Sequence, residues 1–258
     1  MGNPRGGVSQ LKGTELMGYT IQWLRSLFFA VQMYLMMPLM GLVFVPFALF
    51  NREAVYVFIK TYARYCRWTL AWIAGVKTEV RGEVPTDVCL IASKHQSFLD
   101  VIMIISVAWH PRVIIKRELH YMPVFRFFGA RMGNVPVNRG TRGKAITKMK
   151  ADVESGKTLP GQLLIYPQGT RIAPGVKAPY KIGTGLLYEQ TEMDCVPVAT
   201  NVGVFWPKRG VYRKKGLAVL EFLPRIKAGK PRDEFMTEME QVIETASDRL
   251  MAEAGFKG

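Results

Sequence analysis

The chain contains a run of 25 residues without a formal charge, Ser26–Phe50, and this run constrains the fold most strongly. About 20 such residues cross the hydrocarbon core of a bilayer as a helix. Buried helices of soluble proteins are seldom this long or apolar on every side. Its length, its late start and the lack of a small-residue cleavage pattern argue against a signal peptide. Pro38 and Pro46 weaken the helix interior, so a kink or a shallow re-entrant path stays open beside a full span.

A second helix is predicted over residues 54–74. Lys60, Arg64 and Arg67 recur at helical spacing on one side, with aromatic residues on the other. The pattern is typical of an amphipathic helix at a bilayer interface, with its cations toward lipid headgroups. The alternative is a helix packed on a soluble domain with a hydrated basic edge. We therefore expect residues 1–75 to form a two-helix membrane region, and the Lys/Arg balance around it favours a cytoplasmic location for the remainder.

The charge of the chain predicts an anionic partner. Its formal net charge is +15, and residues 112–150 and 207–232 each hold many Lys/Arg and a single acid. Such stretches fit a nucleic acid, a lipid headgroup or a phosphorylated substrate. The three cysteines lie far apart, so neither a disulfide scaffold nor a zinc site is expected, and a reducing compartment fits. We expect no metal and no bound cofactor.

From residue 76 onward, short apolar runs alternate with helical patterns, which predicts an α/β fold with a largely parallel sheet flanked by helices over residues 76–258. The predicted strands cover residues 88–92, 112–116, 162–166, 196–201 and 217–222, and the predicted helices cover residues 98–108, 141–155, 183–190 and 233–252. Ligands of such sheets bind beyond the carboxyl ends of the strands.

The first strand end carries a candidate acid–base pair. His95 follows the apolar run, and Asp100 comes five residues later. A carboxylate that accepts from one ring nitrogen would leave the other nitrogen free to deprotonate an alcohol. No Gly-x-Ser-x-Gly elbow offers a nucleophile, so the substrate hydroxyl would attack directly. Ser97 and Asp100 also match a helix capping box, and the spacing supports both interpretations. His110 and His120 have no carboxylate at useful spacing, so we expect surface or structural roles for them.

Other strand ends carry residues suited to phosphate. The run Pro167–Arg171 reads Pro-Gln-Gly-Thr-Arg, and Arg139 has the same guanidinium chemistry as Arg171. A glycine permits close approach of the backbone, a threonine hydroxyl can donate, and an arginine fork matches phosphate oxygens. From the residues alone, two alternatives remain. Arg139 and Arg171 bind one phosphate together, or they are two unrelated arginines on the surface.

Taken together, these segments resemble the bacterial 1-acylglycerol-3-phosphate acyltransferase family. Four motifs of that family occur here in order. The first block is His95 to Asp100, the second has Lys116, Glu118, Leu119 and Arg139, the third is Pro167 to Arg171, and the fourth is Val196 to Val198. The resemblance covers about residues 76–225, and the apolar N-terminal region is similar to the family's membrane anchor.

The resemblance implies acyl transfer from acyl-CoA or acyl-carrier protein to the 2-hydroxyl of lysophosphatidate, giving phosphatidic acid for phospholipid biosynthesis. It implies that His95 is the general base and that Asp100 orients it. It also implies a place on the cytoplasmic face of the inner membrane. The residues expected to bind the substrate phosphate are Lys116, Arg139, Gly169, Thr170 and Arg171.

One position departs from the family pattern, because Gln168 stands where the family has Glu. The change removes a negative charge beside Arg171 and raises the alternative of another lysophospholipid or a lyso-aminolipid as acceptor. A membrane-tethered nucleic-acid-binding protein is a remote alternative, since the aromatic residues cluster away from the basic stretches. The sequence specifies neither the acyl chain nor the oligomeric state.

Overall fold

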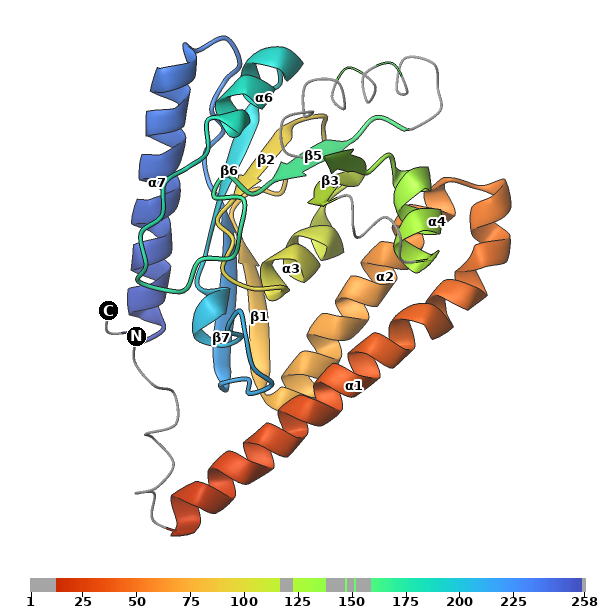
Figure 1. The fold of residues 1–258 in the computed structure, drawn as a ribbon, viewed down its shortest axis with the longest axis vertical. Coiled ribbons are helices and arrows are strands. Elements are labelled where there is room, and N and C mark those ends of the chain that lie inside the picture. The colour runs from red at the N-terminus through yellow and green to blue at the C-terminus, as the bar shows by residue number, and fades with distance from the viewer. Residues whose placement is uncertain (1–12, 117–122, 138–146, 148–150, 152–158, 257–258) are drawn as a thin grey trace.

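The computed structural model describes residues 13–116, 123–137, 147, 151 and 159–256. A seven-stranded sheet in the order β1-β7-β6-β2-β5-β3-β4 forms its centre (Figure 1). The strands are β1 (Val76–Arg81), β2 (Leu90–Ser93), β3 (Pro111–Lys116), β4 (Val135–Val137), β5 (Gln162–Ile165), β6 (Cys195–Thr200) and β7 (Gly216–Phe222). All neighbours pair in parallel except β6 and β7, which confirms the predicted, largely parallel sheet.

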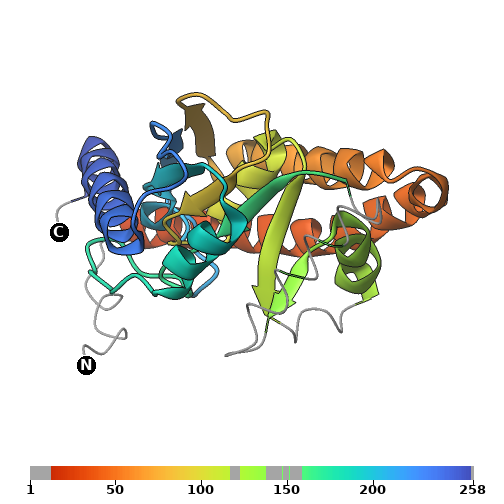
Figure 2. The same cartoon turned by 90° about the horizontal axis from the view of Figure 1, so that it is seen from above.

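Helices cover both faces of this sheet (Figures 1 and 2). They are α1 (Gly13–Phe50), α2 (Glu53–Thr69), α3 (Leu99–Val107), α4 (Pro123–Met132), α6 (Gly183–Thr191) and α7 (Arg232–Glu253), with a π-helical turn at Leu70–Ala74 and a 3-10 turn at Val202–Val204. Ile91 and Leu164 pack into a core shared with α1, α2 and α3. Leu90 and Leu163 point the other way, into a core shared with α6 and α7. This alternation is why short, wholly apolar runs make the central strands.

The five predicted strands are all present, with no end shifted by more than two residues. Strands β1 and β4 were not predicted. The β1 sequence VKTEVR places its side chains at the edge of the sheet, half-buried for the most part, so it lacks an apolar run. Strand β4 has only three residues. A helix is expected over residues 141–155, but within this range the structure describes only Thr147 and Ala151. Both of these residues are helical.

Helix α1 runs without interruption through Pro38 and Pro46. It is the one helix in the described part of the chain that is long and apolar enough to cross a membrane. One side of it is nonetheless part of the protein core, because Phe29 and Met33 pack in the same cluster as the sheet. Gln22 donates hydrogen bonds to two backbone carbonyls of the domain. Most other side chains of α1 are exposed, and many of these are large and apolar.

Arg67 of α2 is turned toward the domain, so the expectation that the cations of this helix face lipid headgroups is wrong for this residue, whereas for the exposed Arg64 it stays a prediction. Arg67 donates to the hydroxyl groups of Thr78 on β1 and Ser106 on α3, at 2.9 and 2.8 Å. Arg64 donates to the Ser106 carbonyl at 3.3 Å. Helical periodicity shows that cations share a side but not which surface that side meets. The predicted boundary at residue 75 falls between the π-helical turn and β1 and stays a prediction, since the preceding helices share the core of the sheet.

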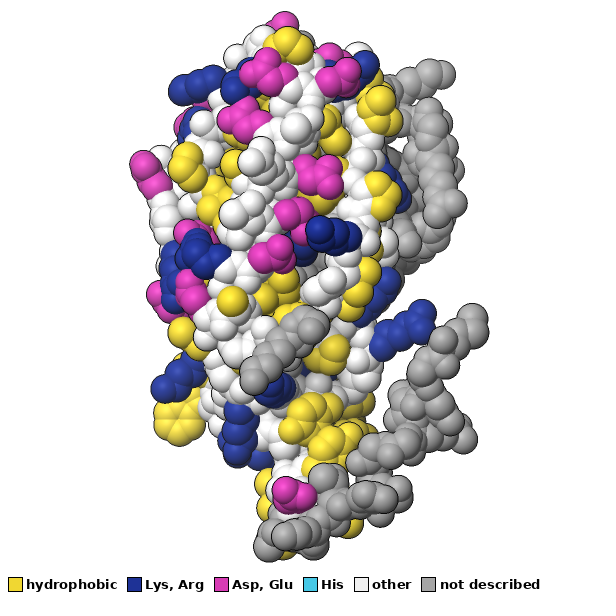
Figure 3. Space-filling view, turned by 90° about the vertical axis from the view of Figure 1, so that its left-hand side faces the viewer, with side chains coloured by type: hydrophobic (Ala, Val, Ile, Leu, Met, Phe, Trp, Pro, Cys, Tyr) yellow, Lys and Arg dark blue, Asp and Glu magenta, His cyan; other side chains and the backbone are white. Residues whose placement is uncertain are grey.

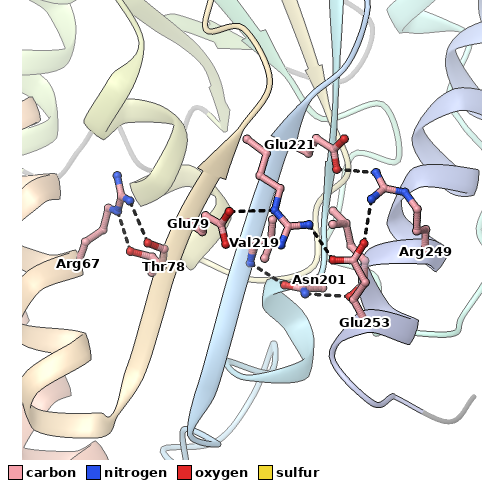
Figure 4. A network of polar contacts seen from close by, with 10 residues as sticks. Arg67, Thr78, Glu79, Asn201, Val219, Glu221, Arg249 and Glu253 are labelled. Carbon is pink, nitrogen blue, oxygen red and sulfur yellow. Dashed lines mark hydrogen bonds and ion pairs between the residues drawn. The ribbon is translucent and has the colours of Figure 1, made fainter.

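A chain of polar contacts fastens α7 across the sheet (Figure 4). Arg81 of β1 pairs with Glu253 of α7 at 2.7 Å. Arg249 of α7 bridges Glu253 and Glu221 of β7, at 2.9 and 2.6 Å. Beneath them, the buried Asn201 side chain accepts from the β7 backbone and donates to the carbonyl of Leu250 on α7. The C-terminal helix is thereby held against β1 and β7.

Candidate active site

The predicted imidazole–carboxylate pair lies beyond the carboxyl end of β2. The Nδ1 atom of His95 is 2.9 and 3.1 Å from the two carboxylate oxygens of Asp100, in the first turn of α3. Asp100 is completely buried, whereas the His95 side chain keeps 17% of its surface exposed. Within the described residues no hydrogen bond engages Nε2 of His95. The arrangement can hold one tautomer and present a basic nitrogen to a ligand.

Asp100 also accepts hydrogen bonds from backbone N–H groups at the start of α3, which agrees with part of the capping interpretation, although the N-cap of the helix is Phe98, one residue after Ser97. One of its oxygens accepts from the backbone N–H groups of Gln96 and Ser97, each at 2.9 Å. The Ser97 hydroxyl in turn accepts from the N–H of Leu99, where the helix begins, at 3.2 Å. The capping contacts therefore fix the orientation of the carboxylate that holds His95.

Both neighbours of His95 are tied to α7. The ammonium of the buried Lys94 forms an ion pair with Glu244. On the other side, the buried Gln96 accepts from the N–H of Gly203 at 3.0 Å and contacts the Met251 sulfur. These partners are more than 100 residues away in sequence, so no local pattern could have indicated them. They immobilise the peptide that carries the imidazole.

Tyr166 is a site residue that the sequence analysis missed. Its ring stacks on the His95 imidazole, with centroids 3.9 Å apart and planes 25° from parallel. Burial and the negative charge of Asp100 raise the pKa of its phenol well above the usual range, so the ring remains neutral. Tyr166 immediately precedes the third motif, and an aromatic residue at this position is the one feature of the sequence that could have indicated its part in the site.

The third motif forms a turn that is fastened to His95. The N–H of Gly169 donates to the Tyr166 carbonyl at 2.9 Å, and the N–H of Ile172 donates to the His95 carbonyl at 2.8 Å. Gly169 has φ of +68°, a left-handed conformation that favours glycine. Gly169 and Thr170 are exposed, and Arg171 directly precedes the residue bonded to His95. The structure thus brings the predicted anion-binding turn beside the predicted base.

Gln168, the residue that departs from the family pattern, is buried, with 3% of its surface exposed. Neither its amide oxygen nor its amide nitrogen finds a hydrogen-bond partner in the described part of the chain. A buried amide in this condition costs free energy, which a bonded ligand would recover.

The second motif lies only partly within the described residues. Lys116 ends β3, and its backbone pairs with Val137, the last residue of β4. Because β2, β5, β3 and β4 are parallel, their carboxyl ends meet at one edge of the sheet. Glu118, Leu119 and Arg139 lie outside the described residues. In the fourth motif, Val196 and Val198 are buried in β6 next to β2, as expected for residues that pack beneath a site.

His110 has the structural role expected for it. Its imidazole is buried, with Nδ1 3.0 Å from the Pro160 carbonyl and Nε2 3.0 Å from the carboxylate of Glu53 on α2. The ring stacks between Tyr56 and Trp109. The partner carboxylate is 57 residues away, so sequence spacing did not reveal it. His120 lies outside the described residues.

A groove of about 740 Å³ lies between α7 and the loop at residues 175–179, close to the His95 peptide. Its lining includes Lys94 and three acids of α7, and Figure 3 shows acidic side chains along this face. His95 is not among the lining residues. No group of His, Cys, Asp and Glu suited to a metal ion is found in the described ranges.

A family model described as Acyltransferase matches residues 77–201, which hold the first, third and fourth motifs and the described part of the second. The sheet, the His95–Asp100 pair and the fastened turn all fall in or next to this region. Residues 77–201 therefore form an acyltransferase domain.

Named relatives make this class more specific. The chain is 27% identical over 197 residues to the 1-acyl-sn-glycerol-3-phosphate acyltransferase of Pseudomonas aeruginosa, covering 76% of this chain and 77% of the relative. It is 28% identical over 193 residues to the putative 1-acyl-sn-glycerol-3-phosphate acyltransferase acl-1 of Caenorhabditis elegans, covering 72% and 73%. The crystal structure of the 1-acyl-sn-glycerophosphate acyltransferase PlsC of Thermotoga maritima has the same fold, with a TM-score of 0.72, 17% identity and coverage of 92% and 97%.

Proposed function

We propose that this protein transfers an acyl chain from a thioester, acyl-CoA or acyl-carrier protein, to the 2-hydroxyl of 1-acylglycerol-3-phosphate. The product is phosphatidic acid, a precursor of phospholipids. The observation that carries the proposal is a partly exposed His95, oriented by a buried Asp100 and fastened to an anion-binding turn. A base and an anion site side by side fit an alcohol whose molecule also bears a phosphate.

In the proposed mechanism, Asp100 accepts the Nδ1–H of His95 and keeps the lone pair on Nε2. Nε2 removes the proton of the substrate hydroxyl while the oxygen attacks the thioester carbonyl carbon. The tetrahedral intermediate collapses as the carbon–sulfur bond breaks, and the imidazolium returns the proton to the leaving sulfur. The N–H groups of Gln96 and Ser97 are bonded to Asp100, so other donors stabilise the oxyanion.

The substrate phosphate is proposed to bind at the edge where the strands end. Gly169 permits close approach of other groups to the turn, and Thr170 offers a hydroxyl and Arg171 a guanidinium. Lys116, the last residue of β3, and Arg139, which lies outside the described residues, would add positive charge, as the family motifs imply. These roles rest on the family motifs and on the common edge of the parallel strands.

The test is a donor-by-acceptor activity matrix with purified protein in detergent. Acyl-CoA and acyl-carrier protein are each combined with 1-acylglycerol-3-phosphate, and His95→Ala is the control. We expect transfer by the native protein and a fall in kcat of about 10²–10⁴-fold in the variant, with an unchanged melting temperature. Equal turnover by the folded variant would refute the role of His95.

A second acceptor class is suggested by Gln168, whose buried amide replaces the family carboxylate. The same chemistry on another lysophospholipid or a lyso-aminolipid would use His95 in the same way. An acceptor panel at equal concentration decides between them. Transfer to unphosphorylated acceptors at the same rate as to 1-acylglycerol-3-phosphate would exclude phosphate recognition.

The exposed side of α1 is proposed to lie in the bilayer, with the catalytic domain at the cytoplasmic face of the inner membrane. The large apolar residues most exposed on α1 include Phe28, Tyr34, Leu35, Leu42, Val43, Phe47 and Phe50. A helix that is part of the core on one side and apolar on the other fits a position along the interface better than a detached span. In this position the lipid acceptor reaches the site from the leaflet.

Substitutions at two adjacent phenylalanines of α1 can distinguish an effect on membrane binding from an effect on folding. Phe28 is 63% exposed and Phe29 is completely buried. We expect Phe28→Ser to weaken flotation with anionic vesicles and to leave the melting temperature unchanged. Phe29→Ala should instead lower the free energy of unfolding by about 3–5 kcal/mol. Unaltered flotation after combined polar substitutions at residues 28, 35 and 42 would contradict the membrane position.

A further inference from the structure

Two lysines outside the four motifs converge on the turn of the third motif. Lys208 follows the 3-10 turn after β6, and its Nζ lies 3.4 Å from the Thr170 hydroxyl oxygen. Lys181 precedes α6, and its backbone N–H donates to the Pro167 carbonyl at 3.0 Å. Its Nζ lies 2.8 Å from the point that a Cβ would occupy at Gly169. Two ammonium groups therefore approach neighbouring residues of one turn from segments that are far apart in sequence.

Gly169 is required for this approach. Its left-handed φ of +68° already disfavours a side chain. The ammonium and the Cδ and Cε carbons of Lys181 also occupy the space beside its Cα, the carbons at 3.1 and 3.2 Å from the point where a Cβ would lie. The glycine thus leaves room for a cation directly over the turn.

Neither lysine forms an ion pair with an acid of the described residues, and both are exposed. Three other lysines, Lys94, Lys227 and Lys230, do pair with acids, namely Glu244, Asp194 and Glu238. Like charges that gather at one turn without a carboxylate repel each other, and an anion bound between them would offset this repulsion.

The turn lies within reach of the proposed base. It is bonded to the His95 carbonyl through Ile172, and it begins at Tyr166, whose ring stacks on the imidazole. An anionic group bound by these ammonium groups would therefore belong to the same substrate molecule as the group that reacts at His95. Ammonium groups bind phosphate oxygens as compact point charges.

We propose that Lys181 and Lys208 bind a phosphate group of a substrate, beside the Gly169–Thr170 turn. The proposal rests on the proposed acyl transfer and adds two specificity-determining residues to it. The phosphate has two sources, the 1-acylglycerol-3-phosphate acceptor and the pantetheine-bearing donor. The short glycerol link between hydroxyl and phosphate favours the acceptor.

The test uses Lys181→Gln, Lys208→Gln and the double variant in the full chain. Lys214→Gln is the matched control, because Lys214 is exposed in the same loop as Lys208 and the substitution removes the same charge. One arm varies the acceptor at saturating acyl-CoA, and the other varies acyl-CoA at saturating acceptor. We expect KM for the acceptor to rise about tenfold in the double variant, with kcat within about twofold of native, since a charged hydrogen bond contributes on this scale.

A rise in KM for acyl-CoA alone would assign the phosphate to the donor and still support the proposal. Unchanged KM values in both arms, or an equal effect of Lys214→Gln, would overturn it. A parallel binding measurement separates this outcome from a failure of the proposed function. Calorimetry in the His95→Ala background, in detergent, measures affinity for 1-acylglycerol-3-phosphate without turnover, and a loss of affinity in the double lysine variant is expected there too.

Discussion

The two loops that meet at the site differ in how far the protein satisfies its own polar groups. Around His95, the carboxylate of Asp100, the ammonium of Lys94 and the amide of Gln96 all have partners within the chain. Around the third motif, the buried amide of Gln168 has none in the described residues, and Lys181 and Lys208 lack an acid there. The loop that carries the proposed base has its partners within the chain, whereas the turn of the third motif would gain partners on binding of the proposed substrate.

This difference follows from the two tasks. A base must hold one tautomer and one orientation at the moment of attack, so its supports are internal and fixed. An anion site lowers the free energy of the bound complex by the bonds that form only on binding. Four substitutions can break or sharpen the contrast.

The largest effect is expected for Asp100→Asn. An amide cannot accept from His95, Gln96 and Ser97 as the carboxylate does, so kcat should fall by about 10²–10⁴-fold. The free energy of unfolding should fall by about 2–3 kcal/mol with the lost charged hydrogen bonds. Steady-state kinetics and urea unfolding measure the two effects. If the variant lost stability but kept the native kcat per folded molecule, Asp100 would have only the capping role.

Glu244→Gln should be next in magnitude. It leaves the Lys94 ammonium buried without a carboxylate, at a cost of about 2 kcal/mol, because Glu244 itself is partly exposed. Glu240→Gln, one turn earlier on the same groove, is the matched control and should cost far less. Urea unfolding compares the pair. Equal losses would show that the ion pair does not support the loop that carries His95.

Ser97→Ala removes one cap acceptor from the N–H of Leu99 and should cost about 1 kcal/mol. The His95–Asp100 contact does not use this hydroxyl, so kcat should remain within about twofold of native. Thermal unfolding and kinetics on one preparation test both statements. A collapse of kcat would instead give the hydroxyl a direct part in the reaction.

Gln168→Leu should have the smallest effect and the opposite sign. Replacement of an unpartnered buried amide by an apolar group of similar size should raise the free energy of unfolding by about 0.5–1 kcal/mol. Addition of 1-acylglycerol-3-phosphate should raise the melting temperature of the native protein more than that of the variant. A destabilised variant would show that the amide already has a partner.

The sequence predicted the parts that local pattern determines. The central strands β2 and β5 were predicted because strands buried on both faces are apolar throughout, and His95 and Asp100 meet because five residues span one loop and the first turn of a helix. The supports of the base were not predictable, since Lys94 and Glu244 are 150 residues apart. The same limit produced the error at Arg67, where helical spacing was correct and the facing surface was not.

The bonds of Gln22 have a consequence for synthesis of the chain. Its amide nitrogen donates to the carbonyls of Ala74 and Arg213, at 2.7 and 2.8 Å. The second partner leaves the ribosome 191 residues after the glutamine. Until the last third of the polypeptide is made, the Gln22 amide lacks this second acceptor, and water must take its place.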